Sequence, residues 1–267
     1  MTATQETYQH LLLEVEDQLA LVTMNRPERR NALSLAHMEE LIAAFQGLGR
    51  RDDVRVVVLK GAGPAFCAGH DLNEMIDRSP TFYRRLFDTC TVLMEAIQSI
   101  PQPVIAQVHG IATAAGCQLA ATCDLVVAAE DARFATPGVK IGLFCSTPMV
   151  ALSRAVPAKK AMEMLLTGEP ISAVEARDFG LVNRVVPAAE LEQATRALAA
   201  KIAAASGPVV ALGKQAFYRQ LNMPQQQAYA YTKELMSFNA TFADAQEGMC
   251  AFLEKRQPRW EEVSSER

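Results

Sequence analysis

Two short segments rich in small residues could bring backbone amides close to a ligand. They are FCAGHDL at residues 66–72 and ATAAGCQLA at residues 112–120. Alanine and glycine have little or no side chain, so main-chain N–H groups in such segments can approach a substrate closely. Two N–H groups that converge on one oxygen form an oxyanion hole, which stabilises negative charge on that oxygen. The same composition also suits ordinary close-packed turns, so the segments have two interpretations.

Strands must position these segments. Short, apolar and largely β-branched runs predict buried strands at VRVVVLKG (54–61), VIAQVHG (104–110) and DLVVAAE (124–130). A helical pattern covers about residues 81–100. This alternation predicts an α/β fold with parallel strands and helical crossovers, in which ligands collect at the carboxyl ends of the strands. Ala115 and Gly116 would then begin a helix, where free N–H groups favour negative charge.

Turn and capping signals divide the N-terminal two thirds of the chain. Residues 10–25 predict a β-hairpin around Asp17-Gln18. The predicted helix starts are Ser34, Thr147-Pro148 and a capping box of Ser172 and Glu175, with Gly180 as the end of that last helix. LVNRVVP, at residues 181–187, predicts one more short strand.

The C-terminal part of the chain has a helical pattern. It begins at about residue 188, and Gly207-Pro208 and Met223-Pro224 interrupt it. No low-complexity linker separates it from the preceding part. We therefore predict an α/β core at residues 1–187 and an all-helical region at residues 188–267.

Composition excludes several classes of partner. The chain has 267 residues, half of them hydrophobic, and a net charge of −4, which disfavours nucleic-acid and anionic-membrane surfaces. No apolar run reaches the roughly 18–20 residues that span a bilayer. The first ten residues have no apolar core of a signal peptide, and no arginine precedes Arg26. We therefore expect no membrane span and a cytoplasmic location.

The six cysteines show no CxxC pair and no ligand-type spacing with the four histidines. A zinc site is therefore not expected, and no other metal is predicted. Without a secretory signal, the expectation is reduced and mostly buried thiols. These cysteines are Cys67, Cys90, Cys117, Cys123, Cys145 and Cys250.

Six motifs occur in an order that resembles the enoyl-CoA hydratase/isomerase (crotonase) superfamily. The resemblance covers about residues 10–257, and it is greatest to the members called enoyl-CoA hydratase domain-containing proteins. The motifs are MNRPERRNALS (24–34), FCAGHDLNEM (66–75), VHGIATAAGCQLAATCDLVVA (108–128), FATPGVKIGL (134–143), LLTGEPISAVEARDFGLVNRVVP (165–187) and AFLEKR (251–256).

This resemblance implies a fold, an assembly and a substrate class. The fold would be a core of repeated ββα units followed by a C-terminal helical trimerisation region, in a homotrimer or a dimer of trimers. The ligand would be an acyl-CoA thioester, with no separate cofactor. By motif position, the backbone amides of His70 and Ala115 would form the oxyanion hole.

The resemblance also implies a set of substrate-binding residues. Arg30 and Ala32 lie in the segment that would line the CoA moiety, and Phe252 and Lys255 would reach its adenine and phosphate end. The positive charge of Lys255 suits a contact with a phosphate group. The alternative is that Lys255 is only a solvent-exposed charge on a helix. The further substrate-binding positions are Ala68, Asp71, Leu72, Asn73, Gly116, Pro137 and Leu143.

Two departures from the family pattern affect the chemistry. Family hydratases use two glutamates, one as base and one as proton donor. The matching positions here are Gln118 and Gly138. An amide can hold water but cannot take its proton near neutral pH, and glycine offers no side chain. A side chain at position 138 could also require a φ that only glycine adopts comfortably. The hydratase mechanism therefore does not transfer directly.

Other candidates for acid–base chemistry each have a structural alternative. His70 has a suitable pKa range and lies beside the predicted hole, but it could serve backbone geometry alone. Asp71 could cap the next helix, His109 could be a structural histidine at a strand end, and Asp124 could bond to nearby backbone.

Nucleophilic catalysis and nucleotide binding have little support in these motifs. Cys145-Ser146 falls near the expected acyl pocket, yet no GxSxG motif supports a nucleophile. GAGPAFCAG, at residues 61–69, has the wrong glycine spacing for a Walker loop or a dinucleotide fingerprint. Two function classes therefore remain. One is an enzyme that acts on an acyl-CoA thioester or enolate, which the retained amide pair favours; the other is a non-catalytic acyl-CoA-binding or partner-binding protein.

Overall fold

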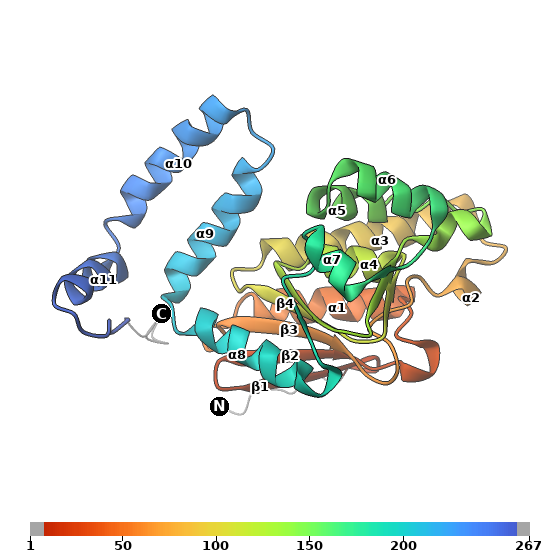
Figure 1. The fold of residues 1–267 in the computed structure, drawn as a ribbon, viewed down its shortest axis with the longest axis horizontal. Coiled ribbons are helices and arrows are strands. Elements are labelled where there is room, and N and C mark those ends of the chain that lie inside the picture. Colours follow the sequence, from red (N-terminus) through yellow and green to blue (C-terminus); the bar gives the residue numbers. More distant parts are fainter. Residues whose placement is uncertain (1–7, 261–267) are drawn as a thin grey trace.

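The computed structural model describes residues 8–260 and builds them around a six-stranded sheet (Figure 1). Most of the N-terminal segment considered for targeting signals, residues 1–7, lies outside this range, as do residues 261–267. The strand order is β1-β2-β3-β4-β6-β9, and only the β1–β2 pair is antiparallel. The strands are β1 (Leu11–Glu16), β2 (Leu19–Met24), β3 (Val56–Gly61), β4 (Val104–Val108), β6 (Leu125–Ala129) and β9 (Arg184–Val186).

The predicted hairpin and buried strands are confirmed. Asp17 and Gln18 join β1 to β2 with φ values of 47° and 66°, the left-handed pair that a two-residue type I′ turn requires. The first four residues of β3 are fully buried, because helices cover both faces of this part of the sheet. A strand buried on both faces has no polar side to alternate with, which explains its continuous apolar sequence.

Helices α1 (Leu35–Leu48) and α3 (Pro80–Ser99) cover one face of the sheet, and α8 (Leu191–Ala203) covers the other (Figure 1). The first face buries Met38, Leu41 and Phe45 of α1 in the main hydrophobic core. The second face buries Leu191 and Ala199 of α8 against apolar strand residues. Ser34 caps α1 as predicted, since its side chain accepts a hydrogen bond from the His37 N–H.

A small second sheet was not predicted. It consists of β5 (Ile111–Thr113), β7 (Arg133–Ala135) and β8 (Ile171–Ser172), in the order β5-β7-β8. Strands of two or three residues are too short to show a period of two, so the sequence gives no signal for them. The sheet is nevertheless important, because β5 leads directly into the second small-residue segment.

Short helices follow these strands. They are α2 (Leu72–Met75), α4 (Ala115–Thr122), α5 (Pro148–Ala155), α6 (Ala158–Thr167) and α7 (Ala173–Asp178), with 3-10 turns η1 (Pro27–Arg29), η2 (Pro137–Ile141) and η3 (Ala188–Glu190). The predicted capping box of Ser172 and Glu175 is present, and Gly180, with φ of 95°, follows the end of α7. The predicted Thr147 cap is wrong. Thr147 already has helical dihedrals and its side chain caps nothing, while Pro148 occupies the first turn as expected.

The last three helices form a C-terminal arm, defined as α9 (Gly207–Gln220), α10 (Gln225–Asn239) and α11 (Ala243–Leu253). Figure 1 shows α9 and α10 side by side and extending away from the body, with α11 returning toward the base of α9. The helical pattern and both predicted breaks are confirmed, with one further break before α11. Because α8 packs on the sheet, the arm itself begins after α8. The domain boundary at residue 187 stays a prediction.

Side-chain hydrogen bonds fasten the base of the arm. Ser206 donates to Asp244 at the start of α11 over 2.5 Å, and Trp260 Nε1 donates to the Ala204 carbonyl over 2.8 Å. Within residues 8–260, no single helix is long and apolar enough to cross a membrane. Only the pair Ala188–Ala203 and Gly207–Gln220 meets that criterion together, and it is bent by 102°.

Lys214 on α9 is a buried cation that joins the arm to the body. Its Nζ lies 2.8 Å from Asp124 Oδ2, and it donates to the carbonyls of Ile97 and Gln102 over 2.8 and 2.9 Å. Tyr218, one turn further along α9, donates to the other oxygen of Asp124 over 2.7 Å. Burial lowers the pKa of Lys214, and the Asp124 carboxylate opposes this shift.

Replacing Lys214 by methionine should destabilise the protein strongly. The substitution leaves the Asp124 carboxylate in a largely buried place without its cation, and breaking a buried pair in this way costs about 3–5 kcal/mol. Urea unfolding at neutral pH measures the change. Lys233→Met is the matched control, because Lys233 pairs with Glu234 on the exposed surface of α10, where a pair is worth about 0–1 kcal/mol. Equal, small losses in both variants would contradict a structural role for Lys214.

Candidate active site

The two small-residue segments meet at a cavity of about 430 Å³. Its walls come from the loop after β3, α2, α3, the start of α4, and the stretch from η2 to the start of α5. None of its lining residues is an aspartate or a glutamate. The lining residues are Ala68, His70, Leu72, Met75, Phe87, Thr113, Ala114, Ala115, Pro137, Gly138, Lys140, Ile141, Leu143, Phe144, Cys145, Ser146, Thr147 and Pro148.

Two glycines allow the segments to touch. A Cβ on Gly69 would lie 2.9 Å from the Ala114 side chain and 3.3 Å from the Ala115 nitrogen. A Cβ on Gly116 would lie 2.2 Å from the Cys67 carbonyl oxygen. Gly69 also has a φ of 89°, which only glycine adopts without strain. Side chains at these two positions would therefore push the walls of the cavity apart.

Polar side chains hold the first small-residue segment, residues 66–72, in place through hydrogen bonds and an ion pair. The Asn31 side chain donates to the carbonyls of Ala62 and Ala65 over 2.9 and 2.8 Å and accepts from the Arg26 N–H over 2.9 Å. Arg26 in turn forms an ion pair of 3.0 Å with Asp71, one residue beyond His70. These contacts fix the main chain on both sides of the cavity loop.

The main-chain pairing of Leu33 determines where the His70 amide points. The Leu33 N–H donates to the Gly69 carbonyl over 2.7 Å, and the Leu33 carbonyl accepts from the Asp71 N–H over 3.0 Å. In such a parallel pairing, the N–H of the intervening His70 lies on the opposite edge of the strand. It donates to no acceptor within residues 8–260, and neither does the Ala115 N–H.

The Ala115 amide is free because it begins α4. The preceding Ala114 donates its N–H to the Ala135 carbonyl over 2.9 Å and has φ and ψ of 51° and −118°, outside the helical region. The first N–H groups of a helix have no partner within it, and they carry the positive end of the helix dipole. The predicted helix start at Ala115 is therefore confirmed, and both amides belong to cavity-lining residues.

The His70 imidazole is largely buried against the edge of Phe87, with 5.5 Å between the ring centroids. Burial lowers its pKa to about 4, although the nearby Leu33 backbone opposes the shift. Neither ring nitrogen has a partner at hydrogen-bonding distance and angle within residues 8–260. The ring is therefore neutral at physiological pH.

Gln118 and Gly138 lie in different surroundings. Gln118 is 5% exposed and does not line the cavity; its Oε1 accepts a 3.8 Å contact from the Cys90 thiol of α3. Gly138 lines the cavity, and its N–H donates to Cys145 Sγ over 3.3 Å. A Cβ on Gly138 would lie 2.0 Å from the Leu143 carbonyl oxygen. The φ constraint expected at this glycine is wrong, because its φ is not left-handed and the obstacle is this contact.

The structure brings together seven of the predicted site residues. The cavity is lined by Ala68, His70, Leu72, Ala115, Pro137, Gly138 and Leu143. Gly116 instead packs on Cys67. The Ala32 carbonyl accepts from the Arg26 guanidinium over 2.7 Å, and Arg30 lies exposed in the preceding turn.

Asp71 and Asn73 do not line the cavity. Burial alone would raise the pKa of Asp71, but hydrogen bonds from Asn73 and Arg26 lower it overall. Asp71 also accepts from the Asn73 N–H and so caps α2, which confirms the alternative given for it from sequence. Its carboxylate is occupied by the contacts with Asn73 and Arg26, and it does not face the cavity as a base.

Phe252 and Lys255 lie far from the cavity within one chain. Figure 1 places α11 at the opposite end of the molecule from α2. Phe252 is 82% exposed, so residues 8–260 leave most of its side chain uncovered. Their predicted role at the adenine and phosphate end of CoA stays a prediction, and within one chain the arm carries them away from the cavity.

Several cavity residues were missed from sequence. Met75, Phe87, Ile141, Phe144 and Pro148 all line the cavity. Their apolar character gives no signal of its own, since apolar residues in helices normally belong to the core. What marks the segment from η2 to α5 is the exposure of apolar side chains between residues 139 and 150, which only the structure shows.

The other titratable candidates have structural roles. His109 Nε2 lies 2.8 Å from the Gly63 carbonyl, and Asp124 accepts from the Val104 N–H over 2.6 Å, as their alternatives predicted. Every cysteine except Cys250 is buried, which confirms mostly buried thiols, and burial raises the pKa of Cys145. Within residues 8–260, no group of three or more histidine, cysteine, aspartate or glutamate residues could hold a metal ion.

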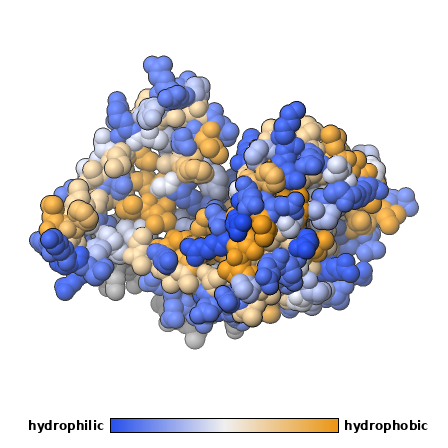
Figure 2. Space-filling model, viewed as in Figure 1, coloured by the Kyte–Doolittle hydropathy of each residue, from blue (hydrophilic) through white to orange (hydrophobic). Residues whose placement is uncertain are grey.

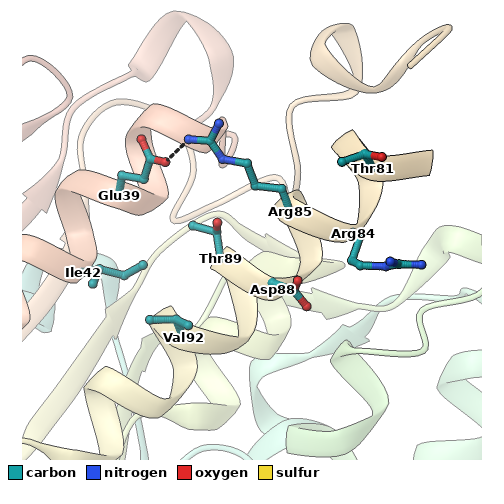
Figure 3. A pocket seen from close by; sticks show the side chains of 8 residues that line it. All are labelled: Glu39, Ile42, Thr81, Arg84, Arg85, Asp88, Thr89 and Val92. Atoms are coloured by element: carbon teal, nitrogen blue, oxygen red, sulfur yellow. Dashed lines mark hydrogen bonds and ion pairs between the residues drawn. The ribbon is translucent and has the colours of Figure 1, made fainter. Parts of the chain in front are cut away.

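A second hollow, between α1 and α3, has different chemistry (Figure 3). Glu39 and Arg85 close an ion pair of 2.8 Å across it, and Arg84 points away from the other side chains. The lining residues of this hollow are Glu39, Ile42, Thr81, Arg84, Arg85, Asp88, Thr89 and Val92.

Comparison with known proteins places the chain in a family. Residues 14–263 match the family described as Enoyl-CoA hydratase/isomerase. The chain belongs to the enoyl-CoA hydratase/isomerase family. It is 48% identical over 245 residues to the human mitochondrial enoyl-CoA hydratase domain-containing protein 3, covering 91% of this chain and 81% of that protein. It is 35% identical over 257 residues to a probable enoyl-CoA hydratase of Mycobacterium tuberculosis, covering 95% and 98%.

Solved structures of family members confirm the predicted crotonase fold. An enoyl-CoA hydratase from Mycobacterium smegmatis superimposes with a TM-score of 0.92 at 52% identity, covering 94% of this chain and 98% of that chain. Human enoyl-CoA hydratase domain-containing protein 3 also gives 0.92, at 47% identity, covering 94% and 100%. The cytoplasmic location stays a prediction, since the name of the human relative includes the word mitochondrial.

Two buried histidines should make this enoyl-CoA hydratase/isomerase family member sensitive to mild acid. Burial lowers the pKa of His37 and His70 to about 4, from an ordinary value of 6.5. Between these values the unfolded chain binds protons that the folded chain does not, so the free energy of unfolding should fall as pH decreases from 6.5 to 4. Urea unfolding at several pH values measures the slope. His37→Gln and His70→Gln should each flatten it, and unchanged slopes in both variants would contradict the assignment.

Proposed function

We propose that this protein binds an acyl-CoA thioester in the cavity, with the thioester carbonyl oxygen between the His70 and Ala115 amides. One observation carries the proposal: both N–H groups belong to cavity-lining residues and lack acceptors within residues 8–260. Buried or half-buried amides without partners are unusual and require an explanation. A ligand oxygen that accepts a hydrogen bond from both N–H groups would explain why neither has a partner in the described chain. Membership of a family that acts on CoA thioesters makes the thioester carbonyl oxygen the natural candidate.

The amide pair would act on the electronic structure of the thioester. Donors aimed at the carbonyl oxygen stabilise the negative charge that develops when an enolate or a tetrahedral centre forms. The N-terminal end of α4 adds a positive dipole on the same side. The apolar walls of the cavity strengthen both effects, since water is displaced by the bound acyl group.

Hydration by a pair of carboxylates is not part of this proposal. No aspartate or glutamate lines the cavity, Gln118 faces Cys90, and the Leu143 carbonyl occupies the space beside Gly138. These observations also favour a second candidate function, in which the protein binds acyl-CoA without turning it over. The neutral His70 ring belongs to a residue that supplies one of the two amides and lines the cavity, so its substitution distinguishes the two candidates experimentally.

We also propose that the protein is a trimer or a dimer of trimers. Helix α10 has no fully buried residue along its 15 residues, although it lies beside α9, so residues 8–260 leave much of its surface uncovered. Figure 2 shows a hollow between arm and body on this face, with apolar residues on both sides of it. A neighbouring subunit would cover these surfaces and could bring its Phe252 and Lys255 to the CoA end of another cavity.

Ligand binding tests the amide pair directly. Calorimetry should show that octanoyl-CoA binds about tenfold more tightly than S-octyl-CoA, a thioether without the carbonyl oxygen, since two hydrogen bonds contribute about 0.5–1.5 kcal/mol each. The rate of crotonyl-CoA hydration, followed by mass spectrometry, should be lower than that of a hydratase with both glutamates. The expected loss is about 10²–10⁴-fold for each missing carboxylate. Gln118→Glu alone should not restore it, because position 138 remains closed.

Three results decide between the candidates. Turnover of another acyl-CoA that is lost in His70→Gln, with thioester binding retained, supports the enzyme. Tight binding without any turnover across a panel of acyl- and enoyl-CoAs supports the binding protein. Equal affinity for octanoyl-CoA and S-octyl-CoA would contradict the proposed oxyanion hole in both cases.

Light scattering tests the assembly. The wild-type protein should have the mass of a trimer or hexamer at micromolar concentration. Met236→Asp should dissociate it, because Met236 is 70% exposed on α10 and a charge there would be buried on assembly. Leu166→Asp, an exposed position on α6 outside the arm, is the matched control. A wild-type monomer would contradict the proposal.

A further inference from the structure

Cys145 is the one cysteine of residues 8–260 that lines the cavity of the proposed thioester site. Its side chain is 6% exposed, and its Sγ accepts a hydrogen bond from the Gly138 N–H over 3.3 Å. A Cβ on Gly138 would lie 2.8 Å from this sulfur, so the thiol fills space that a side chain at position 138 would take. The thiol therefore forms part of the cavity wall beside the position where the family pattern has a glutamate.

The thiol hydrogen of Cys145 donates to no acceptor within residues 8–260. Other buried cysteines differ in this respect. Cys67 and Cys123 donate their thiol hydrogens to the carbonyls of Asn31 and Leu119 over 3.2 and 3.3 Å. These two thiols contribute to the packing of the body, whereas the Cys145 thiol retains both its proton and its sulfur lone pairs for a ligand.

The amide pair in the same cavity points to a ligand independently of the cysteine. The N–H groups of His70 and Ala115 lack acceptors within residues 8–260. In an α,β-unsaturated thioester, Cα directly follows the carbonyl carbon, so a carbonyl oxygen held by these amides brings the double bond into the cavity. The same hydrogen bonds draw electrons toward the oxygen and make Cβ electrophilic. The cavity therefore combines a thiol with a device that activates its electrophile.

We infer that Cys145 adds to a 2-enoyl-CoA bound in this cavity and forms a covalent thioether with its Cβ. The inference rests on the function proposed above and adds a reacting residue and a substrate class. The S–Cβ bond forms as the Cα–Cβ π bond breaks, and the displaced electron pair moves to the thioester oxygen. The two amides stabilise the resulting enolate. The thiol proton ends on Cα, so the addition requires no other reactant and releases no CoA.

The environment of Cys145 makes this reaction depend on the bound thioester. The thiolate is the nucleophilic form of cysteine, and burial raises the pKa of Cys145, although the Gly138 backbone opposes the shift. A free alkylating reagent should therefore react slowly with Cys145. Cys250 has the opposite properties, because it is exposed and lies on α11, at the opposite end of the molecule from α2 (Figure 1). It is the matched control within the same chain.

Intact-mass spectrometry of the full-length protein tests the inference. After incubation with crotonyl-CoA and an acid quench, the wild type should gain the mass of the whole crotonyl-CoA molecule, and peptide mapping should place it on Cys145. Butyryl-CoA, which lacks the double bond, should leave the mass unchanged. Cys145→Ser should lose the adduct, and Cys250→Ser should keep it. Without ligand, iodoacetamide should label Cys250 about tenfold faster than Cys145.

The outcomes distinguish this inference from the proposed function. Calorimetry with butyryl-CoA checks that Cys145→Ser folds, and mapping on the wild type depends on no variant. If crotonyl-CoA binds without a mass gain, or adds to Cys250, the inference is wrong, while CoA-thioester binding stands. A gain of the crotonyl group alone, with release of CoA, would indicate acyl transfer and would also contradict the inference. If neither thioester binds, the proposed function itself fails.

Discussion

The close approach of two loops at Gly69 and Gly116 is the constraint on which the rest of the site depends. Side-chain atoms at either position would overlap main chain of the opposite loop. Contact between the loops brings the His70 and Ala115 amides to one cavity wall, and the bonds of Leu33 and Ala114 orient them. Arg26 and Asn31, although far away in sequence, hold the first loop against this packing.

Gly138 has a comparable effect on the opposite wall. The absence of a side chain allows the Leu143 main chain to close over it, and the closed segment presents Leu143 and Phe144 to the cavity. The same packing leaves no room for a carboxylate there. A cavity without acidic side chains is therefore a property of the main-chain packing as well as of the residue types.

The C-terminal arm connects to this arrangement through buried charge. Lys214 contacts Asp124, which directly follows the C-cap residue of α4, and it also donates to the carbonyls of Ile97 in α3 and Gln102 just before β4. The arm is thus attached to the end of the helix whose other end supplies the Ala115 amide. Such a contact is costly to desolvate, but it specifies one orientation of α9 against the body.

The sequence by itself determined the features that depend on near neighbours. The β1–β2 turn, the Ser34 and Ser172 caps, the buried strands and the helix start at Ala115 follow from local hydrogen bonding and from patterns of apolar residues. Only the tertiary structure decided that Gln118 faces Cys90, that the His70 ring loses its water, and that α11 lies at the opposite end of the molecule from α2. These features depend on distances between segments far apart in the chain. A side chain's surroundings, and with them its pKa and its chemistry, exist only after those segments have packed.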